Sequence, residues 1–302
     1  MFEGWVWWTL LAATMQSVRT AGQKQLAKSV SPMTATLVRY LYGLPFAVLY
    51  VAFLFSDEMI VSGCLPAISP GVTFYISGFI AGVLQIVATV LLIRLFGLRN
   101  FAVGSTFVRS EILLTAIIGI FLFTEQVTSV GWIAMLICVV GLVVISVAKS
   151  GKLTSVWDRS GLYGLGAGLA FALTSLFLRQ ASLSLELPSA TQAAGLTLLY
   201  MVLLQTVLCL AWVCITRIDE LKRVVGLWRA SLFIGFTSLA GSAGWFTAMT
   251  LQSASYVKTL GQIEFLLTLA ISIVYFKEMP TSKELVGMCL IVAGAVLLLF
   301  YG

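Results

Sequence analysis

Residues 111–144 read EILLTAIIGIFLFTEQVTSVGWIAMLICVVGLVV, and residues 264–297 read EFLLTLAISIVYFKEMPTSKELVGMCLIVAGAVL. A shift of 153 positions without gaps places Glu111 on Glu264 and a Thr-Ser pair on a second Thr-Ser pair. Two apolar helices share some letters by chance, but matched glutamates and a matched Thr-Ser pair are not expected by chance. We therefore predict that the chain contains an internal duplication.

The composition identifies the class of protein. The 302 residues are 60% hydrophobic and only 10% charged, whereas soluble domains carry about 25% charged residues. A soluble monomer and a disordered chain are both excluded. The absence of histidine excludes His metal sites, His-based catalytic triads and His proton relays. Five cysteines without a CxxC motif predict neither a zinc site nor a disulfide framework, and no cofactor is expected.

Apolar segments long enough for a membrane recur along the whole chain. A bilayer core requires about 20 apolar residues per helix. Ten segments meet this length, with Ser-Pro, Leu-Pro or Met-Pro at several of the breaks. We predict an all-α polytopic membrane protein with ten transmembrane helices, at 4–26, 33–55, 71–96, 101–123, 128–148, 160–182, 190–216, 227–252, 255–276 and 282–301.

The helix count determines how the two halves are oriented. With five helices each, the halves 1–150 and 151–302 must enter the membrane in opposite directions. Such inverted repeats are typical of secondary transporters, which bind their substrate between the repeats.

Basic residues predict the sidedness. Of the 18 Lys and Arg residues, 13 fall in one alternating set of connections, whereas the other set contains Arg179 and Lys258. The positive-inside rule then places both termini on the non-cytoplasmic side. The same rule accounts for the net charge of +6, and no nucleic-acid-binding module is present.

The sequence resembles a known family. Tyr256-Val-Lys-Thr-Leu-Gly-Gln-Ile-Glu264, followed by Phe276-Lys-Glu278, is similar to the second repeat of EamA-type carriers of the drug/metabolite transporter superfamily. Its counterpart is Val108-Arg-Ser-Glu111, followed by Phe123-Thr-Glu125. The resemblance covers the whole chain and implies a ten-helix carrier for small metabolites, more often an exporter. Many members carry a proline near the positions that are glutamate here.

Two glutamates are the leading site candidates. Glu111 and Glu264 each lie about ten residues into a predicted helix, which corresponds to a depth of about 15 Å, near the midplane. A buried charge is costly, so such residues are functional candidates. Either carboxylate could bind a proton, because burial favours the neutral form, or could pair with a cationic substrate group. The alternative is a permanent structural hydrogen bond or ion pair.

Three arginines form a second candidate group. Arg19, Arg39 and Arg109 are predicted in the cytoplasmic third of their helices, where guanidinium groups could attract an anionic substrate. Arg19 and Arg39 could instead snorkel to the headgroups, whereas Arg109 is deeper. Arg109 and Glu111 are two residues apart and are not expected to pair with each other.

Uncharged residues complete the predicted cavity. Amide side chains would orient a ligand and aromatic rings would supply contact area. Membrane packing or an interfacial belt is the alternative for each of them. These candidates are Gln16, Tyr40, Gln85, Trp245, Tyr256 and Gln262.

The sequence as a whole favours a secondary active transporter of small organic metabolites. It contains no ATP-binding motif, so alternating access would be driven by a gradient, with protons as the candidate coupling ion. It is expected to act in the cell (inner) membrane, as a monomer or homodimer, and not as an enzyme. A lipid flippase or scramblase remains an alternative, and an intramembrane enzyme is a weaker one, since few nucleophile–base pairs exist without histidine.

Overall fold

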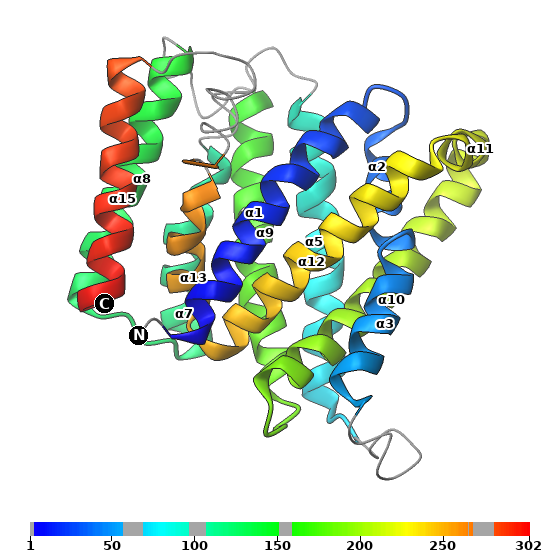
Figure 1. Cartoon of the computed structure of the whole chain (residues 1–302), viewed down its shortest axis with the longest axis horizontal. Coiled ribbons are helices and arrows are strands. Elements are labelled where there is room, and N and C mark those ends of the chain that lie inside the picture. The colour runs from blue at the N-terminus through cyan, green and yellow to red at the C-terminus, as the bar shows by residue number, and fades with distance from the viewer. Residues whose placement is uncertain (1–2, 57–68, 97–106, 151–158, 265, 268–280) are drawn as a thin grey trace. The chain divides into compact units, whose positions relative to one another are not determined.

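The computed structural model describes residues 3–56, 69–96, 107–150, 159–264, 266–267 and 281–302. Within these ranges the regular elements are all helical (Figure 1). Among the described residues, six helical spans are long and apolar enough to cross a bilayer, in agreement with an all-helical membrane protein. These spans are Pro32–Leu54, Val72–Leu95, Arg159–Leu183, Ala190–Thr216, Trp228–Leu251 and Ser282–Tyr301.

The helices form two compact units that do not coincide with the sequence halves. Unit 1 comprises Met1–Ile86 and Thr174–Leu251, and unit 2 comprises Val87–Leu173 and Gln252–Gly302. Each unit therefore combines segments from both halves. Two long helices, α5 (Val72–Phe96) and α9 (Arg159–Leu183), contribute residues to both units.

Unit 1 is held together by close packing of small residues. A Cβ atom added at Gly244 would lie 2.7 Å from the carbonyl oxygen of Trp8, so the backbones of α1 and α12 are in near contact. Glycine allows this approach because it has no side chain. Besides parts of α5 and α9, unit 1 contains α1 (Gly4–Leu26), α2 (Pro32–Leu41), α3 (Leu44–Leu54), α10 (Ala190–Thr216), α11 (Ile218–Gly226) and α12 (Trp228–Leu251).

The second predicted segment is broken within unit 1. Helix α2 ends at Leu41, and α3 begins at Leu44 with Pro45 in its first turn. Proline is favoured there and cannot continue the preceding helix. A Cβ atom added at Gly235 of α12 would lie 2.6 Å from the Tyr42 carbonyl oxygen, so the break packs against a second glycine.

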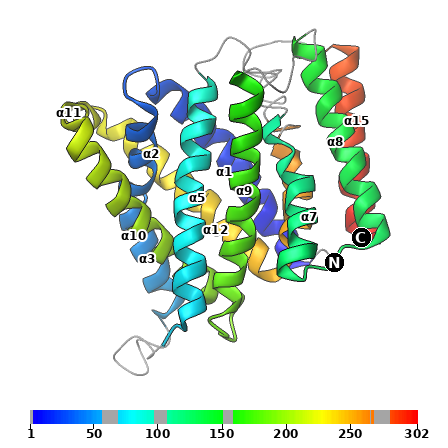
Figure 2. The same cartoon turned by 180° about the vertical axis from the view of Figure 1, so that it is seen from behind.

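Unit 2 is built around an antiparallel helix pair, α8 and α15, which Figures 1 and 2 show side by side. A Cβ atom added at Gly141 would lie 2.6 Å from the Gly287 carbonyl oxygen, so α8 and α15 are also in close contact. The helices of unit 2, besides parts of α5 and α9, are α7 (Glu111–Phe123), α8 (Ser129–Ser150), α13 (Ala254–Leu260), the 3-10 helix η1 (Gly261–Ile263) and α15 (Ser282–Tyr301).

The contact between α8 and α15 repeats under the 153-residue shift. The shift converts the pair Gly141–Gly287 into Gly294–Ala134, and Gly294 also lies against the Ala134 carbonyl oxygen, at 2.8 Å from an added Cβ. The Cys138 thiol lies 3.6 Å from the carbonyl oxygen of Ile291, the residue onto which Cys138 itself is shifted. The two helices are thus related by an internal two-fold centred on this last pair.

The ends of the helices that carry the two glutamates differ from the prediction. The fourth segment was expected to run without interruption over 101–123, yet α7 begins at Glu111, after a turn at 109–110. Here the Ser110 hydroxyl donates to the Phe107 carbonyl, at 2.7 Å, and so competes with helical hydrogen bonding. The ninth segment, expected over 255–276, becomes η1 at Gly261, and most of its remainder lies outside the described residues.

The prediction also misplaced two basic residues. Arg179 and Lys258 were assigned to connections, but they lie within α9 and α13. The Arg179 guanidinium donates to the backbone carbonyls of Met249 and Thr250 in unit 1. These carbonyls belong to the last turn of α12, which leaves them without helical partners.

Candidate functional site

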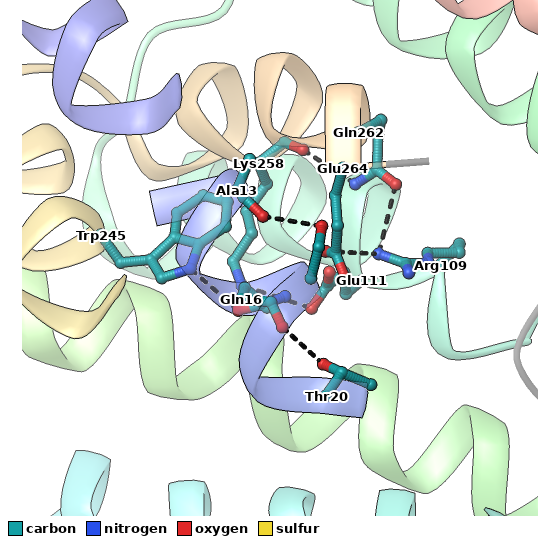
Figure 3. Close-up of polar contacts among 10 residues, drawn as sticks. Ala13, Gln16, Thr20, Arg109, Glu111, Trp245, Lys258, Gln262 and Glu264 are labelled. Atoms are coloured by element: carbon teal, nitrogen blue, oxygen red, sulfur yellow. Dashed lines mark hydrogen bonds and ion pairs between the residues drawn. The ribbon is translucent and has the colours of Figure 1, made fainter. Parts of the chain in front are cut away.

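Four charged side chains of unit 2 form two ion pairs. Lys258 Nζ lies 3.4 Å from Glu111 Oε2, and Arg109 Nη1 lies 3.8 Å from Glu264 Oε2 (Figure 3). Their side chains are only 8–18% exposed. We call Arg109, Glu111, Lys258, Gln262 and Glu264 the charged cluster. Four of its members, Arg109, Glu111, Gln262 and Glu264, are predicted site residues, and the structure brings them together.

Gln262 connects the two ion pairs. Its Oε1 accepts a hydrogen bond from Arg109 Nη1 at 3.4 Å, and its Nε2 donates to the Lys258 carbonyl oxygen at 2.9 Å. Lys258 Nζ also lies 5.6 Å from the centre of the Phe171 ring, a cation–π distance. The amide thus fixes the turn that carries Lys258 relative to the arginine.

The charged cluster is located where helices are interrupted. Arg109 belongs to the turn before α7, Glu111 is the first residue of α7, and Glu264 follows η1. Interrupted membrane helices expose backbone groups that can coordinate a ligand, which is why transporters use them at binding sites. The two breaks occur at equivalent positions of the two halves, because the shift that relates the glutamates also relates Arg109 to Gln262.

The substituents at these equivalent positions make the charge distribution asymmetric. Arg109 faces its own counterpart, the neutral Gln262, across 3.4 Å. Lys258 corresponds to Ser105 in the first half of the sequence. Two cations and two carboxylates nevertheless balance, so the cluster carries no net formal charge. Ion pairing of this kind offsets part of the cost of burying charge. It matches the alternative prediction for the two glutamates, in which each forms a structural ion pair.

Unit 1 contains a separate polar centre around Arg39. The residue is 5% exposed, and its Nε and Nη2 donate to the hydroxyls of Ser238, at 2.7 Å, and Ser242, at 3.3 Å. The guanidinium is therefore directed towards α12 inside the unit. Its carbon also lies 5.1 Å from the centre of the Tyr40 ring. A small cavity lies beside these groups, and its lining includes Gln85.

Two further predicted amides have partners in unit 1. Gln85 Oε1 accepts from Gln205 Nε2 at 2.7 Å. Gln16 Oε1 accepts from Trp245 Nε1 at 2.9 Å (Figure 3). Arg19 of α1 is also buried, with 5% exposure. The predicted site residues thus fall into two groups, one in each unit.

Tyr256 has a position that indicates a structural role. Its hydroxyl accepts from the Thr128 backbone N–H at 3.1 Å and lies 3.0 Å from the Thr128 hydroxyl, at the start of α8. The same hydroxyl of Thr128 accepts from Gly131 N, as Thr281 accepts from Glu284 N at the equivalent helix start.

Two residues of these centres, Lys258 and Gln205, are not among the predicted site residues. Lys258 was counted as a topology marker, although it lies six residues before Glu264 within the quoted family motif. Gln205 was not considered, yet it is fully buried at the centre of α10. A polar residue within an otherwise apolar 27-residue helix was the available signal.

Comparison with known proteins decides the family. The model of the EamA-like transporter family matches residues 3–147 and again residues 159–300. The chain belongs to the EamA-like transporter family. It is therefore a membrane transporter, and the duplicated match agrees with a repeat architecture.

The fold of this EamA-like transporter is also found among solved structures. One solved structure, titled only "Crystal structure of protein", is similar with a TM-score of 0.68 at 15% identity, over 97% of this chain and 94% of the other. At this identity the likeness concerns the fold alone. A search of the curated proteins found no match.

Proposed function

We propose that this EamA-like transporter is a secondary active carrier of small organic metabolites, and that the charged cluster forms part of its substrate site. The observation that supports this is the placement of two buried ion pairs at helix breaks that the internal repeat relates. Alternating access by inverted repeats would use such a location. The charged cluster is also the main concentration of buried charge that the structure describes in unit 2.

The charge balance of the cluster suggests the chemistry of the substrate. A carboxylate on the substrate could take the place of Glu111 beside Lys258, and an ammonium group could take the place of Arg109 beside Glu264. The sequence predicts an anion-attracting group of three arginines, but Arg19 and Arg39 lie in unit 1, apart from the charged cluster of unit 2. We therefore favour a substrate that carries at least one ionised group and can exchange with one of the two pairs.

Proton coupling is proposed through the same carboxylates. Protonation of Glu111 would remove its charge and release Lys258, and protonation of Glu264 would release Arg109. Either event would alter the charge that the site offers to a substrate. In a chain without histidine, carboxylates are the natural carriers of such a proton.

The proposed topology follows the sequence. We propose ten membrane helices in two inverted five-helix halves, 1–150 and 151–302, with both termini outside the cytoplasm. The asymmetry of the basic connections supports this orientation. Export across the cell (inner) membrane is the proposed direction, as the resemblance to EamA-type carriers implies.

The experiment has two stages. A thermal-shift screen of metabolites, sugar phosphates and organic cations identifies ligands, because a bound ligand raises the melting temperature by mass action. Transport of the best ligand is then measured in proteoliposomes between pH 5 and pH 8, with Glu111→Gln/Glu264→Gln and the exposed control Glu186→Gln. The proposal expects transport by the wild type and the control, with a loss in the double variant.

Three results would contradict parts of this proposal. If the double variant retains transport at every pH, the charged cluster takes no part in the mechanism. If the pH dependence of transport is identical in the wild type and the double variant, these glutamates do not couple transport to protons. Transfer of labelled lipid between leaflets, without transport of any solute, would instead identify a lipid scramblase.

A further inference from the structure

Helix α11 connects two membrane spans and is too short to be one itself. It lies between α10, which ends at Thr216, and α12, which begins at Trp228. Its nine residues span about 14 Å, whereas the hydrocarbon core is about 30 Å thick. Because both neighbours are long apolar spans, α11 must lie at the membrane surface. Figures 1 and 2 show it at the ends of these two helices.

A hydrogen-bonded, partly exposed carboxylate fixes the orientation of α11. Glu220 Oε2 accepts hydrogen bonds from Ser31 N, at 3.0 Å, from the Ser31 hydroxyl, at 2.7 Å, and from the Thr34 hydroxyl. These donors belong to the N-terminus of α2. One turn later, Val224 is 2% exposed. The same side of α11 therefore faces the other helices of unit 1 along its length.

The outer side of α11 combines apolar and basic residues. Ile218 and Val225 are 61% and 67% exposed and lie seven residues apart, hence on the same side of the helix. Trp228, just beyond α11, is 52% exposed, and the Arg229 guanidinium lies 5.3 Å from its ring centre. The exposed basic residues of this surface are Arg217, Lys222, Arg223 and Arg229.

We propose that α11 and its two flanks form a binding surface for anionic phospholipids. The apolar residues would enter the boundary between headgroups and acyl chains, while the basic residues contact the phosphates. Four cations face two acidic residues in this stretch, and one of these, Glu220, is occupied by α2. The positive-inside rule places this surface in the cytoplasmic leaflet, which is the leaflet that carries anionic lipid.

This inference does not depend on the proposed substrate. It assigns α11 as a lipid-responsive element that is attached to α2 through Glu220. Bound lipid would hold together the ends of α2, α10 and α12, all of which contact α11. The stability of unit 1 would therefore respond to the charge of the surrounding lipid.

The test is a lipid titration of the purified full-length protein in detergent. Phosphatidylglycerol is added to the wild type, to Lys222→Gln/Arg223→Gln, and to Arg159→Gln/Lys283→Gln, a control that removes two exposed cations elsewhere. Melting temperature is recorded against lipid concentration, with phosphatidylcholine and glycerol phosphate as parallel additions. Each basic residue near an anionic lipid contributes roughly a five-fold change in affinity.

We expect phosphatidylglycerol to stabilise the wild type and the control, with a midpoint roughly ten- to thirty-fold higher in Lys222→Gln/Arg223→Gln. Equal midpoints in all three proteins would overturn the proposal, as would equal stabilisation by phosphatidylcholine. A response to glycerol phosphate alone would show a soluble-phosphate site instead. If the α11 variant does not fold, the proposal is tested on the wild type alone. The stabilisation of the wild type by phosphatidylglycerol must then weaken as the salt concentration rises from about 0.05 M to about 0.5 M, because salt screens exposed charges.

Discussion

Lys258 Nζ and Glu111 Oε2 lie 3.4 Å apart in unit 2, although 147 residues separate them in the chain. The lysine comes from α13 and the carboxylate from the first turn of α7. Both side chains are about nine-tenths buried, so water solvates neither charge well and each is stabilised mainly by its partner. The pair therefore links the two interrupted helices of the proposed site.

Removal of one partner of this pair is predicted to be more harmful than removal of both. Lys258→Gln would leave Glu111 buried opposite a neutral amide, at a cost of about 3–5 kcal/mol. Lys258→Gln/Glu111→Gln would leave two neutral groups that can hydrogen-bond. Thermal unfolding in detergent should therefore place the double variant above the single variant. Additive losses would show that the two side chains are not coupled.

The two serines that hold Arg39 are predicted to differ in their contribution. Ser238 accepts from Arg39 Nε at 2.7 Å, whereas Ser242 accepts from Nη2 at 3.3 Å. A hydrogen bond to a charged group contributes about 1.5–3 kcal/mol, and less when it is long. Ser238→Ala should lower the melting temperature more than Ser242→Ala. The reverse order would mean that Arg39 is held mainly by other groups.

The glycines of the α8–α15 contact are predicted not to tolerate a methyl group. A Cβ atom at Gly287 would lie 2.6 Å from the backbone oxygen of Gly141, which cannot rotate away. Gly287→Ala should destabilise by about 1–3 kcal/mol, despite the better helix propensity of alanine. Gly166→Ala in α9 is the control, because its nearest neighbour is a Leu91 methyl at 3.4 Å. Equal melting temperatures for the two variants would contradict this packing.

The attachment of α11 is predicted to depend on pH. Burial raises the pKa of Glu220, but hydrogen bonds from Thr34 and Ser31 and the charge of Arg217 outweigh it, and the net result is a pKa below the ordinary 4.5. This stabilisation is fully present above pH 4.5 and is lost as the pH falls through the folded-state value. The melting temperatures of wild type and Glu220→Gln should differ most near neutral pH and converge in acid. A gap that does not narrow would contradict the assigned role of this carboxylate.

The sequence alone determined those features that depend on local pattern. Apolar runs of bilayer length identified a helical membrane protein, and a gapless shift of 153 positions related Glu111 to Glu264. The same shift relates the packing of Gly141 on Gly287 to that of Gly294 on Ala134. Residue type and spacing were sufficient here, because helix formation and the burial of apolar faces follow from neighbouring residues.

Only the tertiary structure decided which charges meet. The sequence predicts Lys258 in a connection, because a lysine at the edge of an apolar run has the same sequence pattern whether it faces water or a carboxylate. The interruptions at Arg109 and Gly261 were likewise not visible, since apolar runs do not report where helical hydrogen bonding stops. Partners of a buried charge come from distant helices, as Ser238 does for Arg39 across 199 residues, and their selection is a property of packing. The sequence pattern predicts which residues are buried. The packing of the helices in three dimensions determines which residues they contact.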